Sequence, residues 1–453
     1  MGEAVQQLLS FMDEDDVLAE HVSPEERARL QLQGVSERLD ELRGSIRVLD
    51  HRASQLGIDS VKSLDDVVPL LFAHSVYKSY PESFIAKGQW DRLSLWFDTV
   101  STPPITDIDI SGVADIDDWL ERIEQSGSLP IASSGTSGKG SFLLIDAEDV
   151  ELHQRFTRRG VGFLPPTRFE SRRPVVLLGP SNAAMRYSHA FRQFCETFGR
   201  QGALYSLTDE RMRMADAIRV AAIRRAMGDG TATPSDVAEF EQRAEATANR
   251  NVGAIENLAH AIFNHRDEPQ FLLGPWAVWW RVMEIGHAEG VPDGSFHPDT
   301  AVRVAGGRKG LALPDDYREQ MDRFLGDVVR LDGYGMSELS TSLPKCEAGV
   351  FHPQPWMILF ALDESGEHML EPGEDSRVRG RVGIFDIANH GHWGGIVSGD
   401  QATIDFSVYC RCGRPGPTVE DSVVRYSELS AGGDDKLTCS GMIEAYIRGA
   451  VTE

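Results

Sequence analysis

Two short segments about two hundred residues apart contain residue types that bind phosphate and metal. The first runs from Ser133 to Ser141 and reads Ser-Ser-Gly-Thr-Ser-Gly-Lys-Gly-Ser. Such small residues let backbone N–H groups and hydroxyls turn towards phosphate oxygens, and Lys139 adds positive charge. The segment is not a Walker A loop, because that motif needs glycine where Ser133 stands and a hydroxyl residue where Gly140 stands. A flexible surface loop is the alternative.

The second segment, Leu331 to Glu338, reads Leu-Asp-Gly-Tyr-Gly-Met-Ser-Glu. Its glycines permit unusual backbone angles. Tyr334 offers a flat ring for stacking, and Glu338 offers a hard oxygen ligand for Mg²⁺. A tight turn at the end of a strand is the alternative.

Two further segments fit a nucleotide site. Gly306 and Gly307 follow an expected strand, where glycines let a planar ligand approach the backbone closely. Asp400 ends the segment Ile-Val-Ser-Gly-Asp, and its carboxylate could accept hydrogen bonds from two sugar hydroxyls. The alternatives are an ordinary strand-to-helix turn and a turn aspartate.

The four segments must be positioned by a mixed α/β chain. Residues 131 to 335 alternate expected strands (174–179, 203–207, 271–273, 302–305) with expected helices (208–261 with a break at 228–234, 277–288, 315–325). This alternation argues for an α/β domain. Residues 61–130 mix short helices and loops. After residue 350, short strands at 356–362, 382–387 and 401–409 predict a small β subdomain.

The first sixty residues are predicted to be helical. Ser23 begins a capping box with proline at the first helical position. Apolar residues then follow alternating three- and four-residue steps, as in the seam of a coiled coil: Leu32, Val35, Leu39, Leu42, Ile46 and Leu49. Packing onto the chain's own body and a homodimer contact both explain this seam.

Together and in this order, the four segments resemble the adenylate-forming superfamily of acyl-CoA synthetases, peptide-synthetase adenylation domains and firefly luciferase. Shorter strings resemble the branch of bioluminescence acyl-protein synthetases and phenylacetate-CoA ligases: 69–72, 306–309, 351–356 and 410–414. The resemblance covers residues 65–440. It implies an α/β fold with an N-terminal helical extension (1–60), a large adenylate-forming core with α/β subdomains and a small β subdomain (61–400), and a short truncated C-terminal lid (401–453).

The resemblance also implies a reaction. A carboxylate attacks the α-phosphate of Mg·ATP, giving an acyl-adenylate and pyrophosphate, and an acceptor thiol then takes the acyl group. The implied cofactors are ATP and Mg²⁺, with coenzyme A as the first acceptor and the enzyme's own or a carrier protein's thiol as the second. Amine or hydroxyl acceptors, which would give an amide or an ester, and a non-catalytic nucleotide-binding scaffold stay open.

The resemblance assigns roles to individual residues. The phosphate loop comprises Ser134, Gly135, Thr136, Ser137, Gly138 and Lys139. The adenine segments comprise Gly306, Gly307, Tyr334, Gly335, Met336 and Ser337, while Glu338 would hold Mg²⁺ and Asp400 the ribose. Lys139 is shifted from the usual position of its lysine. The usual late catalytic lysine has no clear counterpart. Either the C-terminal lid is vestigial, or Lys436 or Lys309 substitutes for that lysine.

The acid is expected between these motifs. Ser181, Asn182, Arg186 and His189 follow an expected strand, where α/β folds place their ligands, and Trp276 could wall an aromatic pocket. Solvated loop and core packing are the alternatives. An aromatic or short acid is favoured over a long fatty acid.

Four of the remaining polar residues have the ligand types of a Cys₃His zinc site: Cys346, His352, Cys410 and Cys412. Unmetallated turns are the alternative. Near the C-terminus, Cys439 lies close to Lys436, which could activate it as an acyl-carrying thiol. An ordinary small residue is the other interpretation. Cys195, on an expected helix, is predicted to be core.

Composition narrows the class of protein. A formal net charge of -25 over 453 residues argues against nucleic-acid binding, which needs a basic face, and against anionic membrane surfaces. Five cysteines do not make a disulfide scaffold. No signal peptide or apolar span is evident, so a cytoplasmic protein is expected.

Overall fold

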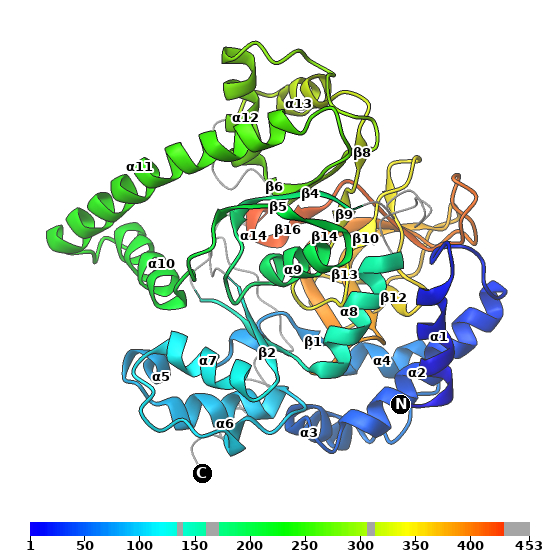
Figure 1. Cartoon of the computed structure of the whole chain (residues 1–453). Helices are drawn as coiled ribbons and strands as arrows, with labels where there is room; N and C mark the ends of the chain where they lie inside the picture. The colour runs from blue at the N-terminus through cyan, green and yellow to red at the C-terminus, as the bar shows by residue number, and fades with distance from the viewer. Residues whose placement is uncertain (134–138, 160–171, 306–312, 430–453) are drawn as a thin grey trace. The chain divides into compact units, whose positions relative to one another are not determined.

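The computed structural model describes residues 1–133, 139–159, 172–305 and 313–429, and the chain divides into two compact units. The first unit comprises residues 1–133, 140–163 and 333–453, and the second comprises residues 134–139 and 164–332. In Figure 1 the second unit carries most of the green elements.

Within the part of the chain that the structure describes, no helix combines the length and the apolar character needed to cross a membrane.

The N-terminal region is helical, as predicted. Its elements are α1 (Glu3–Ser10), η1 (Phe11–Asp13), α2 (Pro24–Leu42) and α3 (Arg47–Leu56). The Ser23 hydroxyl caps α2 by accepting the N–H of Glu26 at 3.2 Å. The predicted seam is wrong at one point, because the helix ends at Leu42 and restarts at Arg47. Gly44, a poor helix former, lies in this break.

The apolar seam of α2 packs on this chain's own residues. Val35, Leu39 and Leu42 are buried. Gly34 lies so close to Leu8 of α1 and Ile387 that a Cβ there would sit 3.4 and 3.3 Å from their methyl groups.

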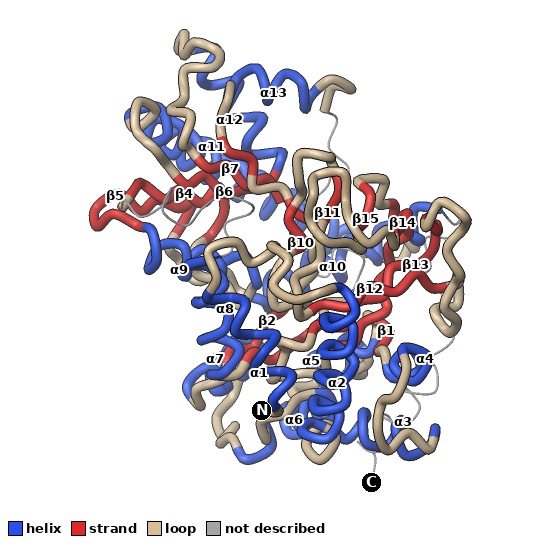
Figure 2. Tube along the Cα trace, turned by 90° about the vertical axis from the view of Figure 1, so that its right-hand side faces the viewer, coloured by secondary structure: helices blue, strands red, loops and turns tan. Residues whose placement is uncertain are grey.

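A seven-stranded sheet forms the centre of the first unit (Figure 2). Its strand order is β11-β15-β14-β13-β12, with β1 and β16 also pairing with β14. All pairs are antiparallel except β1 with β14. The bounds are β1 (Phe72–Ala73), β11 (Val350–Phe351), β12 (Met357–Leu362), β13 (Arg377–Asp386), β14 (Gly395–Asp405), β15 (Thr418–Glu420) and β16 (Val424–Arg425).

Strand β14 starts earlier than the sequence predicts. The expectation was a strand over 401–409, whereas the ladder with β13 already begins at Gly395. Asp400 therefore lies inside a strand rather than in a turn.

An antiparallel hairpin, β2 (Leu129–Ala132) and β3 (Phe142–Ile145), flanks the predicted phosphate loop. The ring of Phe142 lies 5.3 Å from Tyr80 and 5.9 Å from Trp119. These aromatic residues are buried, and Trp119 comes from α7 (Ile116–Gln125). Burial of such large rings is the main apolar stabilisation of the hairpin base.

The second unit has the α/β alternation predicted from sequence. Its sheet has the order β5-β4-β6-β7-β8, and all of its pairs are parallel. The strands are β4 (Arg173–Pro180), β5 (Gly199–Thr208), β6 (Phe271–Pro275), β7 (Ala301–Ala305) and β8 (Val329–Arg330). The helices are α9 (Arg186–Phe198), α10 (Met214–Gly228), α11 (Pro234–Asn264), α12 (Trp276–Ala288) and α13 (Tyr317–Leu325).

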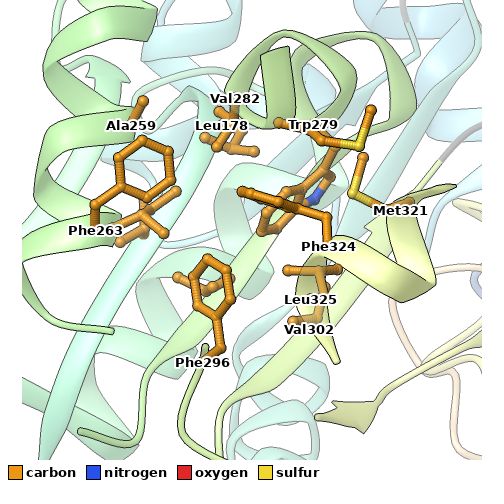
Figure 3. Close-up of a cluster of buried hydrophobic side chains, with 14 of the residues drawn as sticks. Leu178, Ala259, Phe263, Trp279, Val282, Phe296, Val302, Met321, Phe324 and Leu325 are labelled. Atoms are coloured by element: carbon orange, nitrogen blue, oxygen red, sulfur yellow. The ribbon is translucent and has the colours of Figure 1, made fainter. Parts of the chain in front are cut away.

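The core of the second unit lies between this sheet and helices α11 to α13 (Figure 3). Trp279 is fully buried beside Met321 and Phe324. A Cβ at Gly286 would meet the Phe324 ring at 2.8 Å, so these helices pack at a distance that only glycine permits. Trp279 is thus a core residue.

The other elements are short or peripheral to these sheets. They are α4 (Leu64–Val67), η2 (Val68–Leu70), η3 (Val76–Lys78), α5 (Glu82–Ala86), α6 (Trp90–Val100), η4 (Ile105–Asp107), α8 (Ala147–Arg159), β9 (Gly333–Tyr334), β10 (Leu343–Pro344) and α14 (Tyr426–Leu429).

Replacing Gly394 with alanine should destabilise the chain, because a Cβ there would lie 2.0 Å from the carbonyl oxygen of Asp386. We expect a loss of about 1–3 kcal/mol in unfolding free energy, seen as a lower thermal midpoint. Gly44→Ala is the control, since its Cβ meets nothing within 4 Å. Equal midpoints for the two variants would contradict the prediction.

Candidate functional site

Glu338 lies in the loop of a small hairpin, where β9 and β10 pair through Tyr334 and Leu343. The flanking glycines are needed for a different reason than the sequence suggested. Neither Gly333 nor Gly335 has a positive φ. A Cβ at Gly335 would instead lie 3.1 Å from the Cβ of Ser342 on the opposite side of the hairpin. Close approach, not an unusual backbone angle, favours glycine here.

The backbone of Glu338 is fixed by the connection between β13 and β14, residues 387–394. The side-chain amide of Asn389 donates to the Glu338 carbonyl oxygen at 2.8 Å. His392 Nε2 lies 3.2 Å from the same oxygen. At the start of the connection, the buried carboxylate of Asp386 accepts the N–H of Ser340 at 2.7 Å. The loop that carries Glu338 is therefore anchored at two points.

The 387–394 connection is itself held by buried polar contacts. The guanidinium of Arg38, on α2, donates to the Ile387 carbonyl at 2.9 Å. The carboxylate of Asp149 accepts the backbone N–H groups of His390 and Gly391, each at 2.8 Å. Burial raises the pKa of Asp149 to about 6. The rigidity of this connection thus depends on desolvated carboxylates.

The Glu338 carboxyl group is half-buried and lies among other charges. Burial raises its pKa, and the negative charge of Asp400 raises it further. Attraction to Lys78 and His392 works in the opposite direction. A partly desolvated carboxylate of this kind is a strong ligand for a hard cation such as Mg²⁺.

Lys78 and His392 were not identified from the sequence. Pairing of Ala73 with Val397 places the η3 turn, which ends at Lys78, beside strand β14. The neighbouring Tyr77 donates its hydroxyl to the Trp393 carbonyl at 3.0 Å, and its ring meets His392 edge-on at 5.6 Å. The run His-Gly-His-Trp-Gly at 390–394 could have signalled His392. Nothing local marks Lys78.

Tyr334 and Asp400 join the same cluster. The Tyr334 hydroxyl donates to Asp400 Oδ2 at 3.0 Å, and Arg425 Nε lies 3.8 Å from Asp400 Oδ1. Tyr334 is 8% exposed, and its ring centroid lies 6.1 Å from that of Phe351. Burial, followed by the charge of Asp400, raises the Tyr334 pKa well above its usual value. Residues predicted from two distant segments are thus in direct contact.

The residues on either side of the predicted phosphate loop are held by hydrogen bonds. The Ser133 N–H donates to the Ser141 carbonyl at 2.9 Å, and the Ser141 N–H donates to the Ser133 hydroxyl at 2.8 Å. The Tyr80 hydroxyl donates to the Gly140 carbonyl at 3.0 Å. Lys139 is described and half-buried.

Several predicted positions lie outside the described residues. They are Ser134, Gly135, Thr136, Ser137, Gly138, Gly306, Gly307, Lys309, Lys436 and Cys439.

The acid-binding candidates lie at the carboxyl ends of two adjacent strands of the second unit. Ser181 and Asn182 follow β4, and Trp276 follows β6, which pairs with β4. This edge of a parallel sheet is where α/β folds place their ligands. The Ser181 hydroxyl donates to the Thr208 carbonyl. The Trp276 ring lies edge-on to the Tyr317 ring, with their centroids 4.9 Å apart.

Helix α9 carries the remaining two acid-binding candidates, Arg186 at its first residue and His189 one turn on. Burial lowers the pKa of His189 to about 3, and the nearby arginines lower it as well. His189 is therefore neutral at physiological pH and can offer a carboxylate a hydrogen bond but no positive charge.

The predicted zinc ligands converge. One ligand atom from each of Cys346, His352, Cys410 and Cys412 lies within 4.8 Å of all the others. The three cysteines are unpaired as thiols. Burial lowers the pKa of His352 to about 4, which leaves the ring neutral and able to bind a metal. Cys195 lies on α9 and is half-buried rather than core, and burial raises its pKa to about 12.

Together, the two units have the fold of adenylate-forming CoA ligases, as the sequence predicts. The chain is similar to an open conformation of 2-hydroxyisobutyryl-CoA ligase in complex with 2-HIB-AMP and CoA, with a TM-score of 0.51 and 11% identity, covering 92% of this chain and 79% of that chain. The same ligase in the postadenylation state with R3-HIB-AMP gives a TM-score of 0.49 and 11% identity, covering 94% of this chain and 73% of that chain.

The sequence matches no family model and no curated protein. The assignment of the fold therefore rests on the structural similarity alone.

The anchor at Asp386 predicts a pH-dependent effect. Burial raises its pKa from 3.8 to about 6. The folded chain therefore binds this proton more tightly than the unfolded chain, and the stability contributed by the group falls as pH rises towards 6. The Asp386→Asn variant weakens the hydrogen bonds of this side chain at every pH. It also removes the carboxyl group, so the variant lacks this pH-dependent change in stability. Its stability deficit against wild type should shrink by about 1 kcal/mol between pH 5 and pH 7.5. Thermal unfolding of both proteins at both pH values measures this deficit. A deficit that is the same at pH 5 and pH 7.5 would contradict the prediction.

Proposed function

We propose that this protein activates a small carboxylic acid with Mg·ATP to give an acyl- or aryl-adenylate and pyrophosphate. The acyl group is then transferred to a thiol, with release of AMP. The observation that supports this most is the cluster of Glu338, Tyr334 and Asp400 in a chain with the adenylate-forming fold. These three residues have the chemistry that Mg²⁺ and a nucleoside require, and they come from separate segments.

In this proposal Glu338 supplies an oxygen ligand for Mg²⁺, which when bound neutralises phosphate charge. Attack of one anion on another needs such neutralisation and fixed positioning. Lys78 adds positive charge beside Glu338, and its burial lowers its pKa while Glu338 opposes that change. Asp400 would accept hydrogen bonds from ribose hydroxyls, and Tyr334, Gly335, Met336 and Ser337 would form the adenine segment.

The phosphates would contact residues 134–139. The residues that flank this segment, Ser133, Gly140 and Ser141, are held by hydrogen bonds. The acid would lie at the carboxyl ends of β4 and β6, with Arg186 as the residue that can attract its carboxylate. The candidates there are Ser181, Asn182, Arg186, His189 and Trp276. The acyl group of the similar ligase, 2-hydroxyisobutyryl, is small, which supports a short acid beside the aryl acids that the tryptophan favours.

Coenzyme A is the proposed acceptor, because the similar ligase structure is a complex with both 2-HIB-AMP and CoA. An acceptor protein thiol, the chain's own Cys439, or an amine or hydroxyl are the other acceptors. We expect the enzyme to act in the cytoplasm. Zn²⁺ has no step in this reaction.

The central test measures acid-dependent pyrophosphate release over a panel of short 2-hydroxy, aryl and fatty acids, with and without coenzyme A. Products are identified by mass spectrometry. Glu338→Gln should lower kcat by a factor on the order of 10², because the proposed carboxylate ligand of the Mg²⁺ that neutralises phosphate charge is lost. Glu371→Gln, in an exposed loop, is the matched control and should keep wild-type activity.

If Glu338→Gln releases pyrophosphate at the wild-type rate, Glu338 does not have the proposed magnesium role. No release with any acid, together with tight nucleotide binding, would favour the non-catalytic scaffold instead.

Lys78→Met tests the electrostatic balance around Glu338. Without the attraction to Lys78, the pKa of Glu338 should rise further, because burial and Asp400 are then less opposed. The acid limb of the pH–rate profile for pyrophosphate release should therefore move to higher pH. Lys78→Arg keeps the charge and should leave that limb in place. An unmoved limb in Lys78→Met would show that Lys78 does not tune Glu338.

A further inference from the structure

Two turns in the first unit have the same construction, although they lie far apart in sequence. Each begins with a cysteine and has a glycine three residues later: Cys346 with Gly349, and Cys410 with Gly413. In both turns the glycine N–H donates to the cysteine carbonyl at 2.9 Å. Both glycines have positive φ, 80° and 86°.

The remaining contacts of the two turns also match. The cysteine N–H donates to the carbonyl four residues on, Val350 in one turn at 2.9 Å and Arg414 in the other at 2.8 Å. An isolated bridge closes each turn, Lys345 with Phe351 and Tyr409 with Pro415. Two turns that hold their cysteines in the same way present two sulfurs in a fixed geometry.

Strand pairing brings the two turns together. Residues Val350 and Phe351 of β11 pair with Glu420 and Val419 of β15, so the connection between β14 and β15 lies against the first turn. This connection carries both Cys410 and Cys412. His352 comes directly after β11, and its N–H donates to the Pro344 carbonyl at 3.0 Å.

The distances suit a tetrahedral metal ion. A tetrahedron with Zn–S bonds of 2.3 Å and a Zn–N bond of 2.0 Å has S···S edges of about 3.8 Å and S···N edges of about 3.5 Å. The Sγ of Cys412 lies 3.4 Å from His352 Nε2, and all four ligand atoms lie within 4.8 Å of one another. Small movements of the side chains are enough to close the set around one ion.

The surroundings also suit a metal ligand set. The His352 ring hydrogen-bonds to the Pro415 carbonyl. If its Nδ1 is that donor, Nε2 presents its lone pair to the sulfurs, the usual outer contact of a metal-binding histidine. A Zn²⁺ ion with three thiolates and one neutral imidazole carries one net negative charge, and the Arg414 side chain hydrogen-bonds to Cys412.

We propose that Cys346, His352, Cys410 and Cys412 bind one structural Zn²⁺ ion, which ties the β14–β15 connection to the turn before β11. All four coordination positions are filled by protein, as in structural rather than catalytic zinc sites.

The tied connection also contacts helix α2 and the segment that precedes it. The Tyr409 hydroxyl donates to the Glu20 carboxylate at 3.0 Å, and the guanidinium of Arg27 donates to the Gly416 carbonyl. Zn²⁺ would therefore also stabilise the docking of residues 16–27.

Metal analysis tests the site without reference to the proposed reaction. The full chain, purified without a polyhistidine tag, should contain one Zn²⁺ per chain by inductively coupled plasma mass spectrometry. Cys410→Ser and His352→Gln should lose most of it and melt at a lower temperature. Cys195→Ser, which removes a thiol outside the cluster, should keep the full content. Equal zinc in Cys410→Ser and Cys195→Ser would overturn the proposal.

A second measurement covers the case in which the ligand variants fail to fold. Wild-type chain stripped by a chelator and loaded with Co²⁺ should show thiolate charge-transfer bands and tetrahedral d–d bands in visible absorption. Folded wild-type chain that takes up neither Zn²⁺ nor Co²⁺ stoichiometrically would also overturn the proposal.

Discussion

Strand β14 is the element on which both clusters of the first unit depend, because it hydrogen-bonds to four other strands. Its residues Ile396 and Val397 are paired on both sides, with β1 and with β13. The connection before β14 carries His392, the strand itself carries Asp400, and the connection after it carries Cys410 and Cys412. A strand fixed on both edges cannot shift its register without moving all of these side chains.

Buried acidic groups organise the proposed nucleotide site at a cost in stability. The pKa values of Asp149 and Asp386 are raised to about 6 because their charged forms are desolvated. Both carboxylates accept backbone N–H groups of the loops that surround Glu338. Such contacts preorganise a polar site before any ligand binds, and sites of this kind are commonly less stable than an apolar core.

The sequence predicted the order of elements well wherever the apolar pattern was strong. The parallel strands of the second unit and the amphipathic helix α13 follow directly from runs of apolar residues. Tyr334, Glu338 and Asp400 were predicted as site residues because their neighbours form recognisable short segments, and Tyr334 and Asp400 are in contact. The early start of β14 was missed, because it depends on pairing with β13 rather than on local pattern. The helix break at Gly44 has a local cause, since glycine is a poor helix former.

Lys78, Asn389 and Asp386 could not be identified from the sequence. They meet the Glu338 loop only through the β1–β14 ladder and the 387–394 connection. A residue's distance along the chain carries no information about such contacts, and a single sequence gives no covariation with which to infer them.

The imidazole of His392 joins two parts of the molecule that are far apart in sequence. Its Nδ1 lies 3.0 Å from the carbonyl of Leu144, on the strand that leaves the 133–141 loop, and its Nε2 lies 3.2 Å from the carbonyl of Glu338. The His392 ring therefore connects strand β3 with the loop that carries Glu338. The position of the Glu338 backbone is thus linked to the position of strand β3 through a single side chain.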